Sequence, residues 1–262
     1  MRDAPSVRDV VVAPITDRES EHSGNRPTIP PMNVARTNRI AGWSGIAFSV
    51  LSLVVLPLAQ SAPPPLGGTG QELGAWYVAH RTPFLIGNYL GIVAFVPGFV
   101  QLAVLVARVR QSGKDGGWLA PFVASAGTFA YAVFACSLVT FQALPFIVEP
   151  NLERPMEAAN ALATIWFALD GLAALPLVIA VGWAAAETHI LPRWFVPYTW
   201  VTALLALAMS AGALTKEPPW LAAGGLVTGV GFIAFFVWTF VLGVLFLRRT
   251  EDPPTGDGKG GS

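Results

Sequence analysis

Six long apolar runs dominate this sequence and constrain its fold more than any other feature. They are residues Ile40–Ala59, Pro83–Ala107, Trp118–Phe146, Ala161–Ala185, Pro197–Leu214 and Leu221–Leu247. A helix needs about 20 apolar residues to cross a bilayer. The composition agrees, because 53% of the residues are apolar and only 12% are charged, against about 25% charged in soluble proteins. We therefore predict an all-α fold, a polytopic transmembrane bundle of six helices.

The polar ends of the chain set the predicted domain boundaries. Residues 1–39 are mixed in charge and contain five prolines, so we predict a disordered cytoplasmic tail. Residues 40–248 form the predicted transmembrane domain, and residues 249–262 form a second disordered cytoplasmic tail. The first apolar run ends in LPLAQSA, where small residues can also mark a signal-peptidase site. Its length and its long polar lead favour a retained helix.

Basic residues predict the orientation, because Lys and Arg are retained on the cytoplasmic side of membrane segments. With the N-terminus inside, only Arg81, Arg154 and Lys216 of the 16 basic residues fall in outer loops, which leaves 16 − 3 = 13 inside. Most tryptophans fall near the predicted span ends, as in an aromatic belt. Both termini are therefore predicted to be cytoplasmic.

Asp170 is the only charged residue well inside a predicted span. A carboxylate near the bilayer centre costs roughly 2.5 to 3.5 kcal/mol on insertion scales. Asp170 is therefore a candidate functional residue, and its side chain is expected to face protein or water. On a helical wheel it shares its face with small residues such as Ala173 and Ala174, while Ile165 and Leu172 lie opposite. Small residues admit a neighbouring helix and large aliphatic residues suit lipid. Asp170 is therefore predicted to point into the bundle.

Polar side chains of other spans share the depth of Asp170. At 1.5 Å of rise per residue, Asp170 lies roughly 5 Å to the outer side of the middle of its run. Asn88 and Gln142 fall in the outer halves of their runs, and Tyr131 falls near the midplane. In a site of low dielectric constant, such groups could hydrogen-bond the carboxyl and set whether it is ionised. The candidate binding residues are Asp170, Asn88, Gln142 and Tyr131.

A structural role is the alternative for each of these polar residues. Polar contacts in membrane helices often only join helices, at about 0.6 kcal/mol on average. Hydroxyl side chains can also bond their own backbone. That simpler interpretation is preferred for Ser52, Ser210 and Thr228, which lie at the same depth.

The outer loops carry two weaker candidate sites. Glu149, Glu153 and Glu157 have the i, i+4 spacing that on a helix would align three carboxylates for a hard cation. Pro150 and Pro155 make that helix doubtful, so we predict a solvated loop.

The connection from Ser61 to Arg81 is rich in Pro and Gly and ends in GAWYVAHR. We predict a loop here, with Trp76 and Tyr77 at the membrane interface. His80 and Arg81 at its end could meet an anionic head group or one of the outer glutamates.

Other chemistry is not indicated. Three scattered histidines cannot assemble a three-histidine or HExxH metal site. The sequence has no P-loop and no GxGxxG after a strand, so we predict no cofactor and no metal. A net charge of zero gives no reason to expect a nucleic-acid partner. The single cysteine, Cys136, is read as a small buried hydrophobe.

One connection resembles a known element. Leu191, Pro192, Arg193 and Trp194 follow the Asp170 run, and this LPRW stretch is similar to a cytoplasmic element in uncharacterised bacterial families of small, roughly six-helix integral membrane proteins. Those families have no assigned activity. The resemblance therefore implies a fold class and a bacterial inner (plasma) membrane location, and it assigns no functional residue.

Three functions fit these observations. The preferred hypothesis is a small-solute or ion-coupled transporter in which Asp170 titrates or binds the ligand. The first alternative is an intramembrane enzyme that acts on a lipid or isoprenoid with Asp170 as general acid, although no second ionisable partner is visible in the spans. The second is a structural or accessory subunit whose Asp170 pairs with another protein. The predicted partners are membrane lipid and a small molecule or ion, and the oligomeric state is left open.

Overall fold

The computed structural model describes residues 34–60, 64–65, 67–112, 116–147, 153–215 and 217–249. The disordered tails were predicted at residues 1–39 and 249–262. Residues 1–33 and 250–262 of these tails lie outside this part of the chain, and residues 34–39 are helical. Helix accounts for 87% of the structure, and no strand occurs among the described residues.

Seven α-helices and two short 3₁₀ turns make up the described fold. In chain order they are α1 (Val34–Gln60), α2 (Gly70–Ala79), α3 (Arg81–Gln111), α4 (Gly116–Ala143), η1 (Leu144–Phe146), α5 (Glu153–Thr188), α6 (Phe195–Ala211), η2 (Gly212–Leu214) and α7 (Leu226–Arg248). Six of these α-helices, all except α2, are long and apolar enough to cross a membrane. The prediction of an all-α bundle with six spans is confirmed.

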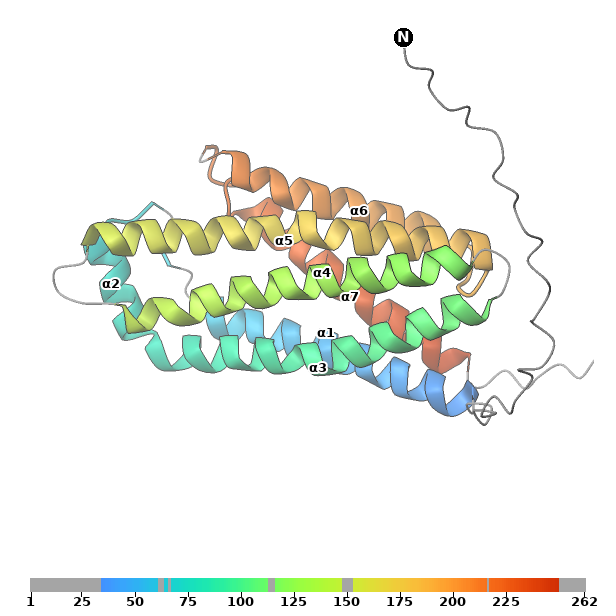
Figure 1. Cartoon of the computed structure of the whole chain (residues 1–262). Helices are drawn as coiled ribbons and strands as arrows, with labels where there is room; N and C mark the ends of the chain where they lie inside the picture. Colours follow the sequence, from blue (N-terminus) through green and yellow to red (C-terminus); the bar gives the residue numbers. More distant parts are fainter. Residues whose placement is uncertain are drawn as a thin grey trace, which may run out of the picture. The chain divides into compact units, whose positions relative to one another are not determined.

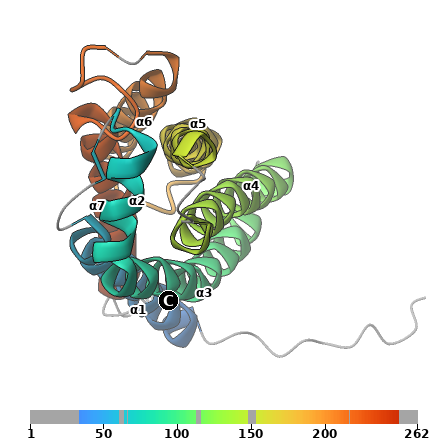
Figure 2. The same cartoon turned by 90° about the vertical axis from the view of Figure 1, so that its left-hand side faces the viewer.

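The six long helices form a ring. Contacts run from α1 to α3, α4, α5, α6 and α7 in turn, and α7 closes the ring on α1. Figure 1 shows these helices from the side, and Figure 2 shows them end-on with α2 in front. Small residues allow close approach, since a Cβ added to Gly171 of α5 would lie 2.3 Å from the carbonyl oxygen of Ala206 on α6. We call the two ends of the ring the α2 end and the arginine end, where α3 and α7 finish in arginines.

The outer surface of the ring is apolar. Large side chains are widely exposed on it, for example Val96 on α3 (67% exposed), Phe129 on α4 (54%) and Leu204 on α6 (67%). A soluble monomer rarely leaves contiguous apolar surface of this extent in water. Six apolar helices with such a surface give the chain the architecture of a multi-pass membrane protein.

The prediction of a loop between Ser61 and Arg81 was wrong, because helix α2 lies within this segment. Thr69 and Glu72 form a capping box: Glu72 Oε2 accepts from Thr69 N at 2.9 Å, and Thr69 Oγ1 accepts from Glu72 N at 3.3 Å. This box satisfies two backbone donors and starts a helix in a segment that is otherwise rich in Gly and Pro. Tyr77 is fully buried against the bundle. The sequence signal was Thr-x-x-Glu, which the Pro and Gly content hid.

Helix boundaries also extend beyond the predicted runs. Helix α5 begins at Glu153, well before the predicted Ala161, and it contains Pro155 in its first turn. Proline is tolerated there because the first N–H groups of a helix have no partner within it. The solvated loop predicted around Glu153 and Glu157 is therefore wrong from Glu153 onward. Helix α1 begins at Val34, before the predicted Ile40.

Candidate functional site

A cavity of about 130 Å³ lies inside the ring, between its middle and the α2 end. Five of the six spans line it, and α6 does not. Its lining residues are Phe48, Ser52 and Val55 of α1, Phe84, Asn88, Gly91 and Phe95 of α3, Phe134, Leu138 and Phe141 of α4, Thr164, Phe167 and Asp170 of α5, Phe232 and Phe236 of α7, and Pro64 and Gly224 of two connections.

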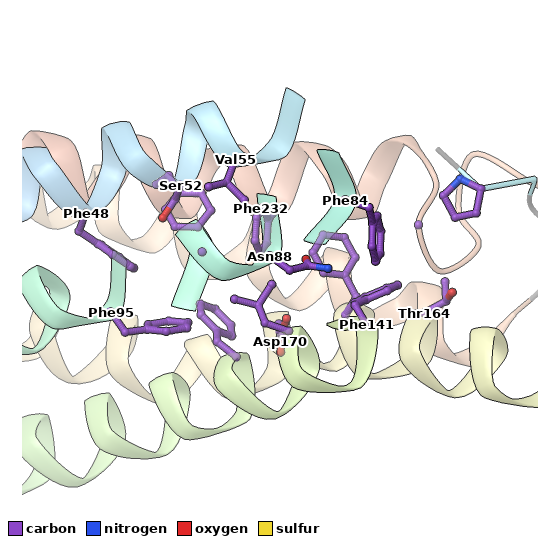
Figure 3. A pocket seen from close by; sticks show the side chains of 17 residues that line it. Phe48, Ser52, Val55, Phe84, Asn88, Phe95, Phe141, Thr164, Asp170 and Phe232 are labelled. Atoms are coloured by element: carbon purple, nitrogen blue, oxygen red, sulfur yellow. The ribbon is translucent and has the colours of Figure 1, made fainter. Parts of the chain in front are cut away.

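Eight phenylalanines give the cavity its shape, in two groups. The deeper group, which we call the floor, is a closed circuit of ring contacts with centroids 4.7 to 6.4 Å apart, formed by Phe48, Phe95, Phe134, Phe232 and Phe236. The second group, which we call the wall, leads from Phe232 toward the α2 end through Phe167, Phe141 and Phe84. Figure 3 shows Phe48 and Phe95 at one end of the cavity and Phe84 and Thr164 at the other. Tilted and edge-on pairs of this kind contribute about 0.5 to 1.5 kcal/mol each beyond buried area.

Asp170 is the deepest lining residue of α5, beside the floor. Its side chain is 2% exposed, so the predicted inward orientation is confirmed. The span of α5 covers Pro155–Thr188, which places Asp170 about 2 Å from the middle of that span. The Ser137 hydroxyl of α4 is in reach of the carboxyl, yet neither Ser137 Oγ nor Asp170 Oδ1 forms a hydrogen bond with any described residue.

Asn88 lines the same cavity from α3. Its side chain is 4% exposed, and its amide nitrogen Nδ2 has no hydrogen-bond partner among the described residues. Figure 3 shows Asn88 and Asp170 entering the cavity from different helices. We call Asn88, Ser137 and Asp170 the unpaired cluster. Buried polar groups in proteins nearly always have partners, so three unpaired groups in one region require an explanation.

The other predicted candidates lie elsewhere. Tyr131 is buried outside the lining, and its hydroxyl donates to the Gly98 carbonyl at 3.4 Å. Gln142 also falls outside the lining, although its Oε1 is buried without a described partner. The structure therefore brings Asp170 and Asn88 to one cavity and leaves Tyr131 and Gln142 out of it. Ligand binding by any of the four stays a prediction.

The hydroxyl residues predicted at the depth of Asp170 fall into two groups, those that bond a backbone carbonyl outside the lining and one that lines the cavity. Ser210 donates to the Leu207 carbonyl at 2.7 Å and Thr228 to the Ala222 carbonyl at 3.5 Å, which is the backbone role predicted for them. Ser52, in contrast, lines the cavity. Ser137 and the eight phenylalanines were not singled out from the sequence. Among the 16 phenylalanines of the chain, nothing in the sequence marks the ones that meet.

A second polar cluster lies on the other side of the floor, toward the arginine end. Ser49 Oγ and Thr239 Oγ1 are 2.8 Å apart, and Gln101 Nε2 donates to the Thr239 carbonyl at 3.2 Å. Each hydroxyl also bonds a backbone carbonyl of its own helix, at Gly45 and at Phe236. We call Ser49, Gln101 and Thr239 the paired cluster. Its bonds join α1, α3 and α7.

Helix α2 covers the α2 end of the cavity. The Tyr77 ring packs 5.3 Å from that of Phe84, which lines the cavity, and the Tyr77 hydroxyl donates to Asn160 Oδ1 of α5 at 2.8 Å. Burial raises the pKa of the Tyr77 phenol, so this hydroxyl stays a donor at neutral pH. Glu157 Oε1 accepts from the Gly70 N–H at 2.7 Å, which holds the start of α2 on α5.

Ligand binding at the two weaker sites of the outer loops stays a prediction. His80 stacks on Trp76 with ring centroids 4.6 Å apart, and Arg81 lies over the Phe146 ring at 5.2 Å. Glu149 lies outside the described residues, and the side chain of Glu153 is not described. No group of three metal-ligating side chains occurs in the described part of the chain.

No family model, curated protein or solved structure matches this chain. The class of the protein therefore rests on its own geometry. The chain is a multi-pass membrane protein with six spans and an internal, phenylalanine-lined cavity that contains one buried carboxyl group.

Proposed function

We propose that this protein is a small-solute transporter in which Asp170 binds either a proton or the ligand, so that one is exchanged for the other. The observation that carries the proposal is the buried carboxyl with an unpaired oxygen, set in a cavity near the middle of its span. Transporter sites commonly lie near the bilayer midplane. An unpaired carboxylate in an apolar cavity is costly, so the group holds either a proton or a bound cation.

The position of the cavity, nearer to the α2 end than to the arginine end, supports transport over a purely structural role. The lining includes Pro64 and Gly224, which belong to connections at the α2 end, whereas the floor separates the cavity from the arginine end. A solute that enters from the α2 end can leave on the opposite side only if the floor rearranges. Binding that favours one of two such arrangements is the basis of alternating access.

The lining also favours binding over acid–base catalysis. Asp170 is the only ionisable residue among those lining the cavity. Tyr89 of α3 and Tyr131 and Cys136 of α4 also titrate, but all three fall outside the lining. Tyr89 and Cys136 are exposed on the outer surface, so the prediction that Cys136 is buried was wrong. General acid–base catalysis usually needs a second group to take or return the proton. A single carboxyl suits exchange of a proton for a cation.

The orientation and location belong to the same proposal. Arginines gather at the arginine end, at positions 36, 39, 108, 110, 193, 248 and 249, whereas Arg81 and Arg154 are the described arginines at the α2 end. By the positive-inside rule the arginine end faces the cytoplasm, both termini are inside, and the cavity is reached from the outer side. We infer a bacterial inner membrane from the LPRW resemblance.

Proton flux in proteoliposomes tests the function. The purified protein is reconstituted with a pH-sensitive dye inside, and a panel of amines, amino acids, carboxylates and sugars is added outside. We expect at least one class to drive proton flux in the wild type and in Thr239→Val of the paired cluster, and Asp170→Asn to reduce that flux to the level of empty vesicles. Equal flux in wild type and Asp170→Asn would remove Asp170 from the mechanism, and no solute-dependent flux with any class would contradict transport.

Cysteine labelling tests the orientation. Cys136→Ser provides a background without thiols, into which Leu214→Cys at the α2 end or Gln111→Cys at the arginine end is introduced. A membrane-impermeant maleimide added to intact cells should label only the Leu214→Cys protein. Labelling of only Gln111→Cys would reverse the orientation.

A further inference from the structure

We propose that the ligand of the cavity is a small hydrophobic amine, bound as a cation with its N–H groups on Asp170 and its hydrocarbon part against the phenylalanine rings. The inference rests on the proposed function only in treating the cavity as a ligand site. It adds the chemical class of the ligand, which is argued from the lining.

The charge of the ligand follows from the single ionisable group of the lining. Asp170 lines the cavity, and the Ser137 hydroxyl is the neutral donor in its reach, so no positive charge of the protein faces this carboxyl in the lining. The lining contains no Lys, Arg or His that could supply one. A ligand ammonium provides both the donor and the opposite charge, and a hydrogen bond between charged groups is about twice as strong as a neutral one.

The phenylalanines exclude an inorganic cation. Hard cations such as Ca²⁺ take six or more oxygen ligands, whereas eight of the lining residues are phenylalanines and few carry a side-chain oxygen or nitrogen. Aromatic faces instead attract organic cations through the ring quadrupole, within about 6 Å of the ring centroid. The floor presents such rings beside Asp170.

The size of the ligand follows from the cavity volume. A cavity of about 150 Å³ with apolar walls binds benzene in another protein, and the cavity here has about 130 Å³. The ligand is therefore a short-chain or single-ring amine. Asn88 adds a selective contact, because its unpaired Nδ2 can donate to an oxygen atom on the ligand.

Calorimetric binding with matched probes tests the ligand class in the purified protein. Butylamine and 1-butanol have the same number of heavy atoms and differ in charge, and 1-amino-2-propanol adds an oxygen acceptor. We expect butylamine to bind more tightly than 1-butanol by about 10- to 100-fold, the range for a hydrogen bond to a charged group. Asp170→Asn should abolish that difference, and Thr239→Val should preserve it. Asn88→Ala should weaken 1-amino-2-propanol and leave butylamine unchanged.

Equal binding of butylamine and 1-butanol by the wild type would overturn the ligand class. Loss of the butylamine preference in both Asp170→Asn and Thr239→Val would also overturn it, because the effect would then be general loss of structure. The two proposals fail separately. If sugars or carboxylates drive proton flux and amines do not bind, the ligand class is wrong and the transport function stands. If amines bind and no solute drives proton flux, the transport function is wrong and the ligand class stands.

Discussion

Two buried polar clusters lie on opposite sides of one aromatic floor, and they differ in whether their groups have partners. In the paired cluster, Ser49, Gln101 and Thr239 bond one another or nearby carbonyls across α1, α3 and α7. In the unpaired cluster, each member leaves one polar atom without a described partner. Both clusters come from membrane-spanning helices of similar composition. The paired cluster therefore has the contacts expected of polar groups that join helices, whereas Asn88 and Asp170 combine unpaired atoms with a place in the cavity lining.

The largest expected effect comes from substitution of Phe232, the ring shared by the wall and by the floor that separates the two clusters. Phe232 contacts the rings of Phe134, Phe167 and Phe236, so Phe232→Ala opens the barrier between the clusters. We expect the free energy of unfolding to fall by about 3 kcal/mol, the usual cost of removing a packed ring. Reversible unfolding in detergent measures it. The control is Phe240→Ala on the same helix, which is 36% exposed and should cost less; equal losses would show that the floor is not packed as described.

Removing a hydroxyl from the paired cluster should have the next largest effect. Thr239→Val keeps the volume and removes the bonds to Ser49 and to the Phe236 carbonyl. The free energy of unfolding should fall by about 1 to 2 kcal/mol, which is near the upper range for polar contacts in membrane helices. Amine binding should stay within about twofold of the wild-type affinity. A large loss of binding would merge the two clusters into one functional unit.

Replacing the unpaired carboxyl should change stability in the opposite direction. Asp170→Leu removes a buried acid that has no described partner for Oδ1, and substitution of unpaired buried polar groups by apolar ones is often stabilising. We expect a gain of up to about 1 kcal/mol in the free energy of unfolding, with loss of solute-dependent proton flux. A protein destabilised as much as Thr239→Val would place Asp170 among the structural contacts instead.

The smallest effect should come from the cover over the cavity. Tyr77→Phe removes the bond to Asn160 and should cost about 0.5 to 1 kcal/mol, because the ring contacts remain. Burial raises the pKa of Tyr77 above its ordinary 10.0 in the folded state. The contribution of the protonated Tyr77 to the free energy of unfolding is therefore complete below pH 10.0 and decreases as the pH rises above that value. Ultraviolet titration of tyrosinate should lose one late-titrating phenol in Tyr77→Phe, and an unchanged titration would contradict the burial of this ring.

Prediction from the sequence succeeded where a single helix decides the outcome. The apolar length of each run defines a span, whichever neighbour it meets. The inward orientation of Asp170 followed from the small residues on its face and the aliphatic residues opposite, and Leu172 is indeed 50% exposed. The missed helix α2 was also local, since its capping box can be read from Thr69 and Glu72.

The membership of the site, in contrast, depended on how several helices rotate and cross. Depth along the axis gave Asn88, Gln142 and Tyr131 as equal neighbours of Asp170, and only Asn88 shares its cavity. Rotation about the helix axis decides whether a side chain at a given depth faces the cavity, and that rotation is set by packing contacts such as the one at Gly171.

The six-span bundle and the inward-facing carboxyl could be predicted from the sequence, because the cost of a polar group in hydrocarbon acts on each residue separately. The pairing of the polar groups and the eight phenylalanines around the carboxyl became visible in the folded chain. Hydrogen bonds and ring contacts between helices depend on the relative position of residues far apart in the chain, and no single run contains that information.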